Sequence, residues 1–351
     1  MSSLPKADVV IVGGGPGGTA TAIHCAQKGL QVTLLEQAEF PRSHPGETLH
    51  PGIEPLLKKL GVAEQVLSAG FLRHPGHYIE WQGEREFQAF GEDEQGPWLG
   101  FQAMRSQFDS LLLEQAQTLG VQILQPCRAL EPIVNQGQVK GLNTTLGSID
   151  AAFVVDAAGS CQWLARKLGI RTTPYSPPLK AYYGYATGEC PERDQAPLIA
   201  SDAEGWTWIA KVEHQRYQWT RLSFDSQPDA HWHPEDLADL FPEGKARAVD
   251  VTWRLVNPAA GPGYFLVGDA AAVLDPASSH GVLKAMTSGM MAAHLIVQSF
   301  QQGEQLQPSP ASRYCAWLRT NFYHDLIHLQ GFYAPILSAL SSSPTLQSTS
   351  F

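Results

Sequence analysis

The feature that most constrains the fold of this chain is a strand–turn–helix–strand pattern near its N-terminus. Residues 8–12 are an apolar run that predicts a buried parallel strand, and residues 32–35 predict a second one. Between them, residues 13–18 form a glycine-rich turn, and residues 19–27 predict a helix. Together they form a complete βαβ unit, which places the two strands in one parallel sheet.

The glycine-rich turn has the spacing of a dinucleotide-binding site. Residues 13–18 read GGGPGG and match G-x-G-x-x-G. In such a turn Gly13 permits the sharp reversal, Gly15 lets a pyrophosphate approach the backbone, and Gly18 lets the helix pack closely on the strand. Glu36 follows the second strand at the offset of an acid that accepts hydrogen bonds from ribose hydroxyls. Because no second motif of this kind follows a strand, we expect one bound dinucleotide, with any reductant bound transiently or delivered by a partner.

Composition excludes several classes of function. The formal net charge of -10 argues against nucleic acid and anionic membranes as default partners. The five cysteines are scattered and form no Cys-x-x-Cys pair, which predicts no zinc site or disulfide framework and favours the cytoplasm. No apolar run is long enough to span a bilayer, and we expect no signal peptide. His324 and His328 share a predicted helix face, but without nearby carboxylates or thiolates we expect packing rather than a metal site.

A second motif indicates which dinucleotide is bound. Val267-Gly268-Asp269-Ala270-Ala271 places an acid directly after a predicted buried strand, and residues 275–281 add a proline turn and a run of small residues that opens a helix. This arrangement can hold a ribityl chain and a pyrophosphate and can place a helix N-terminus beside a redox ring. The sequence therefore favours FAD over NAD.

The order of these motifs resembles a known family. The glycine turn with Glu36, residues 105–109 (RSQFD), residues 155–159 (VDAAG) and the Gly268-Asp269 pair resemble the glutathione-reductase-type FAD-binding fold. More narrowly, they resemble the group of flavoprotein monooxygenases, flavin-dependent halogenases and geranylgeranyl reductases. The resemblance covers nearly the whole chain. It implies FAD contacts from Gly13, Gly15, Pro16, Gly17, Gly18, Glu36, Arg42, Arg105, Ala129, Gly268, Asp269, Pro276, Gly281 and Val282.

The resemblance also sets the expected architecture. We predict an α/β fold with a discontinuous, Rossmann-like FAD-binding domain at residues 1–170 and 255–305. Residues 171–254 alternate aromatic and polar residues, which predicts a mixed or antiparallel substrate sheet, joined by strands inserted near residues 71–100. Residues 306–351 are expected to be a C-terminal helical segment and tail.

Two departures bear on the subgroup. The segment Trp206-Thr207-Trp208-Ile209-Ala210 resembles the W-x-W-x-I-P motif of flavin halogenases but lacks its proline. In the phenol and pyrrole halogenases an essential lysine lies in a G-F-x-x-K-x-G context, and here His74 takes its place in residues 70–76. The departures favour shorter relatives that resemble the LodB-like flavoproteins, which help to build tryptophylquinone cofactors.

The expected activity is FAD-dependent monooxygenation of an electron-rich aromatic ring through a C4a-(hydro)peroxyflavin, with a tryptophan of a partner protein as one candidate substrate. His280 and His74 are the candidates for proton handling, and Glu47 is a weaker one. Trp206 and Trp208 either line the substrate pocket or belong to the core. The other reactants are O2 and electrons from NAD(P)H or a flavin reductase. The alternatives are a flavin-dependent halogenase, a geranylgeranyl-reductase-like oxidoreductase and a non-catalytic flavin-binding protein.

Overall fold

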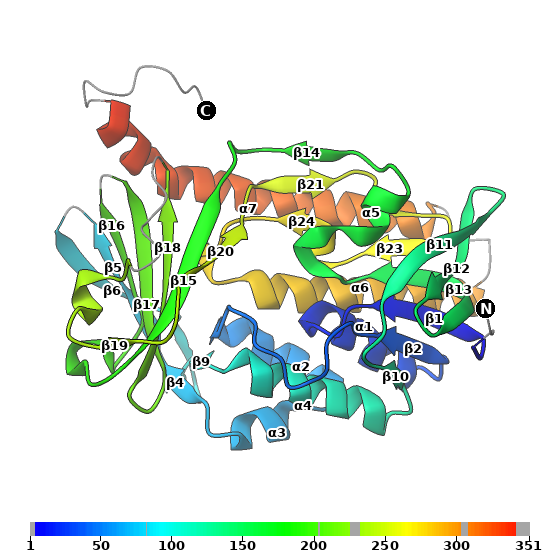
Figure 1. The fold of residues 1–351 in the computed structure, drawn as a ribbon, viewed down its shortest axis with the longest axis horizontal. Helices are drawn as coiled ribbons and strands as arrows, with labels where there is room; N and C mark the ends of the chain where they lie inside the picture. Colours follow the sequence, from blue (N-terminus) through cyan, green and yellow to red (C-terminus); the bar gives the residue numbers. More distant parts are fainter. Residues whose placement is uncertain (1–3, 82, 203, 225–231, 303–307, 342–351) are drawn as a thin grey trace.

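The computed structural model describes residues 4–81, 83–202, 204–224, 232–302 and 308–341. Two large sheets lie at opposite ends of the long axis, and the C-terminal helix α7 (Pro310–Ser341) runs along one side of the molecule from one sheet toward the other (Figure 1). This mixed α/β architecture confirms the predicted fold class. Among the described residues no helix is long and apolar enough to cross a membrane.

The first sheet carries the predicted βαβ unit. Its parallel strands lie in the order β10 (Gln122–Leu124), β2 (Val32–Leu35), β1 (Ala7–Val12), β13 (Gly147–Asp156) and β23 (Tyr264–Leu266). The last of these strands comes from a segment far away in the sequence, so the chain leaves this sheet and returns to it. The sheet is extended by antiparallel strands, namely β12 (Gln138–Thr144) and β11 (Ala129–Asn135) beyond β13, and β22 (Ala260–Gly261) beside β23.

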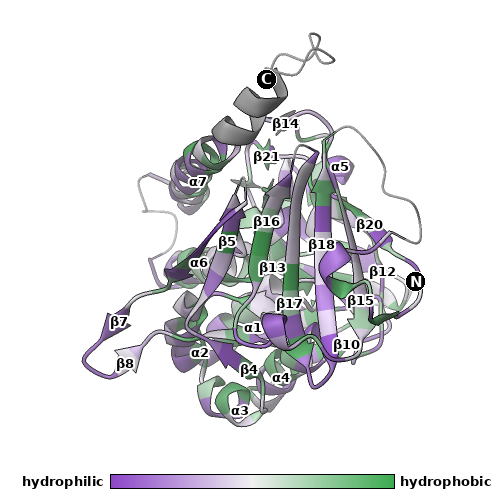
Figure 2. Ribbon diagram, turned by 90° about the vertical axis from the view of Figure 1, so that its left-hand side faces the viewer, coloured by the Kyte–Doolittle hydropathy of each residue, from purple (hydrophilic) through white to green (hydrophobic). Residues whose placement is uncertain are grey.

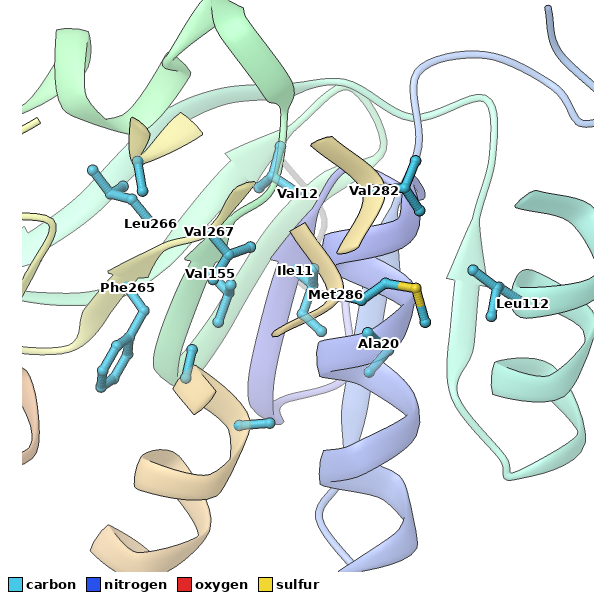
Figure 3. Packing of buried hydrophobic residues seen from close by; sticks show 14 of the residues in the cluster. Ile11, Val12, Ala20, Leu112, Val155, Phe265, Leu266, Val267, Val282 and Met286 are labelled. Carbon is cyan, nitrogen blue, oxygen red and sulfur yellow. The ribbon is translucent and has the colours of Figure 1, made fainter. Parts of the chain in front are cut away.

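The core of this half lies between the sheet and three helices. Helix α1 (Pro16–Gln27) packs on α4 (Arg105–Thr118) and on α6 (Gly281–Gln302), and Figure 3 shows Ala20 of α1 beside Met286 of α6. The contact between α1 and α6 is close because it is lined by glycine. A Cβ atom on Gly289 would lie 2.3 Å from the Gly17 carbonyl oxygen. Both helix N-termini are thereby held at the same end of the sheet.

The second sheet is mainly antiparallel and combines two distant parts of the chain. Strands β15 (Lys180–Thr187), β18 (Arg216–Ser223), β17 (Gly205–Glu213) and β16 (Leu198–Asp202) form its centre. Strand β5 (Gly76–Trp81) pairs in parallel with β16, and β6 (Glu84–Ala89) pairs with β5. The edge strands are β19 (Phe241–Pro242) and β20 (Arg247–Asp250), which both pair with β15.

The remaining elements are short and connect the two halves. Strands β3 (Thr48–Leu49), β9 (Gly100–Gln102) and β4 (Leu72–His74) form a small sheet. Figure 2 shows a hairpin of β7 (Glu92–Asp93) and β8 (Gly96–Pro97) that projects from the body. The other elements are α2 (Glu54–Leu60), α3 (Ala63–Ser68), α5 (Trp163–Lys167), β14 (Thr172–Pro174), β21 (Arg254–Val256), β24 (Ala272–Val273) and the 3-10 turns η1 (Pro51–Ile53), η2 (Gly159–Cys161), η3 (Pro191–Arg193), η4 (Glu235–Leu237), η5 (Gly268–Ala270) and η6 (Pro276–Ser278).

Candidate active site

The glycine turn is fixed by close approach of the backbone. Gly13 has a φ angle of +108°, and a Cβ atom added to it would lie 2.4 Å from the Ala157 carbonyl oxygen. A Cβ atom on Gly18 would lie 2.0 Å from the Gly13 carbonyl oxygen. No heavy atom pair tolerates such distances, so these positions need glycine. The turn therefore has the tight geometry that the G-x-G-x-x-G spacing predicts.

The N-terminus of α1 is suited to an anion. Gly15 caps this helix without a side-chain hydrogen bond, so its first N–H groups have no side-chain acceptor. Arg42 lies beside it, with Nη2 3.5 Å from the position of a Gly15 Cβ atom. The Arg42 guanidinium also lies 3.7 Å from Glu36 and 3.6 Å from Asp109. Free amide donors, the helix dipole and one partly exposed arginine together favour a pyrophosphate.

Glu36 is buried at the end of β2 and organises the backbone around it. Its Oε2 accepts a hydrogen bond from Gly14 N at 2.9 Å, and its Oε1 accepts one from Ala38 N at 2.9 Å. Its carbonyl oxygen accepts a hydrogen bond from Cys127 N at 2.7 Å. That bond brings the segment leading to Ala129 next to the end of β2. A contact of Ala129 with adenine remains a prediction.

Arg105 lies deep in the same region, and its guanidinium is already satisfied by protein. Its Nε and Nη2 donate to the Asp109 carboxylate at 2.8 and 2.9 Å, and Nη1 donates to the Pro45 carbonyl oxygen at 3.0 Å. The paired geometry explains how a residue only 5% exposed stays charged. Arg105 therefore joins α4 to the loop before β3, and its expected contact with FAD remains a prediction.

Gly268 and Asp269 lie in the same region as Arg105, although they come from a segment far away in the sequence. Gly268 adopts a φ of +57°, and its N–H donates to Ser288 Oγ at 2.9 Å. Asp269 faces solvent but has protein atoms on its other sides. Burial raises the pKa of its carboxyl, while Arg254 and Arg105 act against that rise. An acid in this position can accept hydrogen bonds from the hydroxyls of a ribityl chain.

These residues fit an FAD molecule. We name the set formed by residues 13–18, Glu36, Arg42, Arg105 and Asp269 the dinucleotide cradle. It offers bare backbone and a helix N-terminus for the pyrophosphate, and one buried acid, Glu36, and one solvent-facing acid, Asp269, for the two sugar chains. A Cβ atom added to Gly281, at the start of α6, would meet no atom within 4 Å. The start of α6 is thus open to a ligand.

A cavity of about 260 Å³ lies directly before α6. It is lined by side chains from five segments of the chain. The lining residues are Thr48, His50, His77, Gln88, Ala89, Phe90, Trp208, Ala277, Ser279 and His280. We call it the histidine cavity. The sequence pointed to Trp208 and His280, but it missed His50, His77 and Phe90. The clustering of histidines in residues 44–77 was the available signal.

The imidazoles of the histidine cavity are held neutral. Burial, together with the nearby His50 and Lys284, lowers the pKa of His280 to about 4, although Asp325 opposes the shift. Burial also lowers the pKa values of His50 and His77. The ring centroids of His50 and His280 lie 4.6 Å apart. Near neutral pH these side chains can therefore accept or donate a hydrogen bond without bringing charge into the cavity.

His74 lies apart from the histidine cavity. It is 2% exposed within the small sheet, and its Nδ1 is 2.8 Å from the Gly76 carbonyl oxygen. Its Nε2 has no hydrogen-bond partner in the described structure, and burial lowers its pKa to about 4. Its ring packs on Phe90, whose side chain lines the cavity. The position that the sequence aligned with the halogenase lysine is thus behind the cavity wall, and the expected proton transfer by His74 gains no support from this placement.

The two tryptophans of β17 have different environments. Trp208 lines the histidine cavity, whereas Trp206 is fully buried and donates through Nε1 to the Tyr333 hydroxyl at 2.6 Å. Tyr333 in turn donates to Asp275 Oδ2 at 2.8 Å, and Trp253 Nε1 donates to the same oxygen at 2.7 Å. Trp206 is thus a core residue, in agreement with one of the two interpretations of the motif, and helps to tie α7 to the turn that begins with Asp275 and Pro276.

Glu47 also lies behind the cavity rather than in it. It is 1% exposed, and its Oε1 accepts a hydrogen bond from the Tyr185 hydroxyl at 2.5 Å. Its Oε2 accepts one from Gly46 N at 2.9 Å. Burial raises the pKa of the Glu47 carboxyl, and the bond from Tyr185 opposes the rise. The residue connects the loop before β3 to the second sheet, and a direct role in catalysis remains a prediction.

Comparison with known proteins agrees with this geometry. A family model described as an FAD binding domain matches residues 6–305. The chain is 30% identical to a tryptophan 2-halogenase of Chondromyces crocatus, over 93% of this chain and 67% of that protein. It is also 30% identical to a 1H-pyrrole-2-carbonyl-[peptidyl-carrier protein] brominase of Pseudoalteromonas luteoviolacea, over 89% of this chain and 82% of that protein. The fold matches the flavin-dependent brominase Bmp2 with a TM-score of 0.81, at 24% identity over 97% and 91% of the two chains.

The cradle and these matches define the class of protein as an FAD-dependent oxidoreductase. The chain belongs to the FAD-binding family whose members include the flavin-dependent halogenases and monooxygenases. FAD is its cofactor. The relatives described above are halogenases, so the expected similarity to LodB-like proteins is not what the comparisons show.

Proposed function

We propose that this protein halogenates an electron-rich aromatic ring bound in the histidine cavity. The observation that carries the proposal is the position of an aromatic-lined cavity at the start of α6, in a chain whose relatives are halogenases. Trp208 and Phe90 provide apolar walls for the ring, and Thr48 and Gln88 provide polar groups. FAD, when bound, supplies the oxidising chemistry that turns a halide into an electrophile.

His280 is the residue that we assign to proton transfer. When a halogen replaces a hydrogen on an aromatic ring, the ring carbon loses a proton and the C–H electron pair returns to the ring. A neutral imidazole can take that proton. His280 is half-buried, lines the cavity and stays neutral because burial lowers its pKa to about 4.

Aromatic hydroxylation is the second candidate, and one observation favours it. Among the described residues that line the histidine cavity there is no lysine. Lys284 follows His280 by one helical turn, but its Nζ pairs with Asp325 Oδ2 at 3.1 Å. An enzyme of this group that lacks the lysine expected of halogenases would insert oxygen from O2 instead. The comparisons favour halogenation, so hydroxylation stands second.

The substrate and the electron donor belong to the same proposal. The brominase relative acts, by its name, on a pyrrole held by a carrier protein. A ring presented by a partner, as a carrier-bound aromatic group or as a protein tryptophan, suits a cavity that opens to solvent. We propose that NAD(P)H or a separate flavin reductase supplies the electrons, since the chain has one dinucleotide motif of the strand–turn–helix type.

The test is a single-turnover reaction analysed by mass spectrometry. The FAD-loaded protein is reduced without oxygen and then mixed with O2, bromide and either indole or a pyrrole amide. Halogenation predicts a product with the paired isotope masses of bromine. A product that gains only one oxygen atom would replace the first candidate by the second. Consumption of O2 without any change in the aromatic compound would contradict both candidates.

A further inference from the structure

His50 occupies a position that fixes which of its ring nitrogens carries the proton. It caps the 3-10 turn η1, and its Nδ1 accepts a hydrogen bond from the backbone N–H of Gly52 at 3.0 Å. A backbone amide can only donate, so Nδ1 must be unprotonated. In a neutral imidazole the proton then lies on Nε2. The local turn therefore selects one tautomer.

The same contact keeps His50 neutral. A second proton on the ring would have to sit on Nδ1, where it would face the amide proton of Gly52. Burial acts in the same direction and lowers the pKa of the imidazole. The protein therefore holds a neutral N–H donor at this position near neutral pH.

The imidazole ring that carries this donor lines the histidine cavity. The His50 ring lines the cavity and packs on His280 at 4.6 Å and on Phe90 at 5.1 Å between ring centroids. Within the described residues, Nε2 of His50 has no hydrogen-bond partner. A polar N–H group at the wall of an aromatic cavity without a protein acceptor is suited to a ligand.

The lining also limits the charge of that ligand. The described residues around the cavity include three imidazoles, one amide and two hydroxyls, and none is a carboxylate, a lysine or an arginine. An ionised carboxylate or ammonium group would leave water without finding an opposite charge, which is unfavourable. An uncharged ring that carries a carbonyl group brings no ionised group into the cavity, so its binding leaves no charge without a counter-charge.

We propose that His50 is a specificity-determining residue whose Nε2–H group binds a carbonyl oxygen on an uncharged aromatic substrate. Ionised forms of the same ring are excluded because the cavity offers them no counter-charge. The aromatic nature of the occupant rests on the proposed function. The donor and the charge selection rest on the contacts of His50 and on the cavity lining alone.

The test uses binding to the oxidised, FAD-loaded protein, so it requires no turnover. The probes are pyrrole-2-carboxamide and pyrrole-2-carboxylate, which have similar shapes and differ in charge. Isothermal titration calorimetry should show the carboxamide bound about tenfold more tightly or better. Equal affinities, a preference for the carboxylate, or no binding of either probe would overturn the proposal. Failure of halogenation with intact selective binding would count against the proposed function only.

Two substitutions distinguish the loss of the His50 hydrogen-bond donor from a general loss of folding. His50→Asn keeps a side-chain oxygen that can cap η1 but removes the ring donor, so carboxamide binding should weaken by about tenfold. The melting temperature and the FAD content should stay those of the control His294→Asn, which changes an exposed histidine on α6. Unchanged carboxamide binding in a folded His50→Asn protein would refute the assignment.

The preference for uncharged ligands is also tested by placing a positively charged side chain in the cavity lining. Gln88 lines the cavity from the exposed strand β6, so Gln88→Lys should fold and should improve carboxylate binding relative to carboxamide by about tenfold. Gln95→Lys makes the same change in the exposed turn between β7 and β8, outside the cavity lining. It should leave the ratio unchanged. If Gln88→Lys and Gln95→Lys bound carboxylate and carboxamide with the same affinity ratio, the ligand would not lie beside residue 88, and the proposal would be contradicted.

Discussion

The dinucleotide cradle and the histidine cavity are built in opposite ways. The cradle is made mostly of backbone, and its shape depends on glycines where an added Cβ atom would lie as close as 2.0 Å to another main-chain atom. The histidine cavity is made of side chains from β3 to η1, from β5 and β6, from β17 and from the turn before α6. The first therefore tolerates almost no change in its backbone, whereas the second can be altered one side chain at a time. The contrast indicates that the backbone of the fold determines which cofactor binds, whereas the side chains that line the cavity determine which substrate binds.

The largest expected effect is in the cradle. Gly18→Ala places a methyl group 2.0 Å from the Gly13 carbonyl oxygen, so the turn between β1 and α1 must move. We expect no soluble FAD-loaded protein, or a loss of about 3 kcal/mol or more in the free energy of unfolding. Flavin absorbance and a denaturant titration measure the two effects. The control is Gly331→Ala on α7, where the methyl group meets no atom and stability should be unchanged or slightly higher. A Gly18→Ala protein with full FAD content would show that the cradle is not rigid.

The next effect concerns the cavity and leaves the cofactor in place. His280→Gln removes the proposed base, and we expect kcat to fall by about 100-fold while FAD stays bound. His74→Gln changes a histidine behind the cavity wall. It should lower the melting temperature, and it should reduce kcat much less than His280→Gln does. Steady-state halogenation assays and thermal melts of both variants make the comparison. If His74→Gln lowered kcat as much as His280→Gln, the placement of the reactive group would be wrong.

A smaller effect tests the polar network that joins the two regions. Tyr333→Phe leaves Trp206 Nε1 without its acceptor and removes one of the donors to Asp275. A buried polar group without a partner destabilises a protein by about 1–3 kcal/mol. The free energy of unfolding should fall by that amount. Tyr323→Phe, at an exposed hydroxyl that bonds to Tyr175, is the matched control and should change it by less than about 0.5 kcal/mol. Equal effects of the two substitutions would mean that the buried network adds no stability.

The same contrast explains how much of the molecule the sequence could predict. The cradle is encoded within short stretches, so the βαβ unit and the roles of Gly13 and Gly18 follow from local spacing. The histidine cavity depends on the pairing of β5 with β16, which joins segments far apart in the chain. Local patterns carry no signal for such a pairing, and the position of His77 in the cavity was therefore missed.

The tryptophan motif shows the same limit on a smaller scale. Trp206 and Trp208 are two residues apart on β17, so they share one face of the sheet and look equivalent in the sequence. They differ because Tyr333 of α7 reaches the first, whereas the second packs on His77 and lines the histidine cavity. The packing of a distant helix thus decides which tryptophan faces a ligand.

The smallest expected effect is a loss of stability in mild acid, and it depends on the buried histidines. Burial lowers the pKa values of His74 and His280 from 6.5 to about 4. Between these values the unfolded chain binds more protons than the folded protein, so the free energy of unfolding decreases as the pH falls from 6.5 toward 4. For His74, which is 2% exposed, the loss between pH 7 and pH 5 should be on the order of 1–2 kcal/mol.

Denaturant titrations at several pH values test this, with His74→Gln as the informative variant. The substitution should lower stability at pH 7 but should also flatten the decrease between pH 7 and pH 5, because one titrating group has been removed. His294→Asn, at an exposed site, should leave the slope unchanged. A slope that did not differ between the His74 variant and the unmodified protein would mean that His74 is not kept neutral by burial. In that case the cavity wall would be more open to water than its packing indicates, and the distinction between His74 and the cavity histidines would lose its basis.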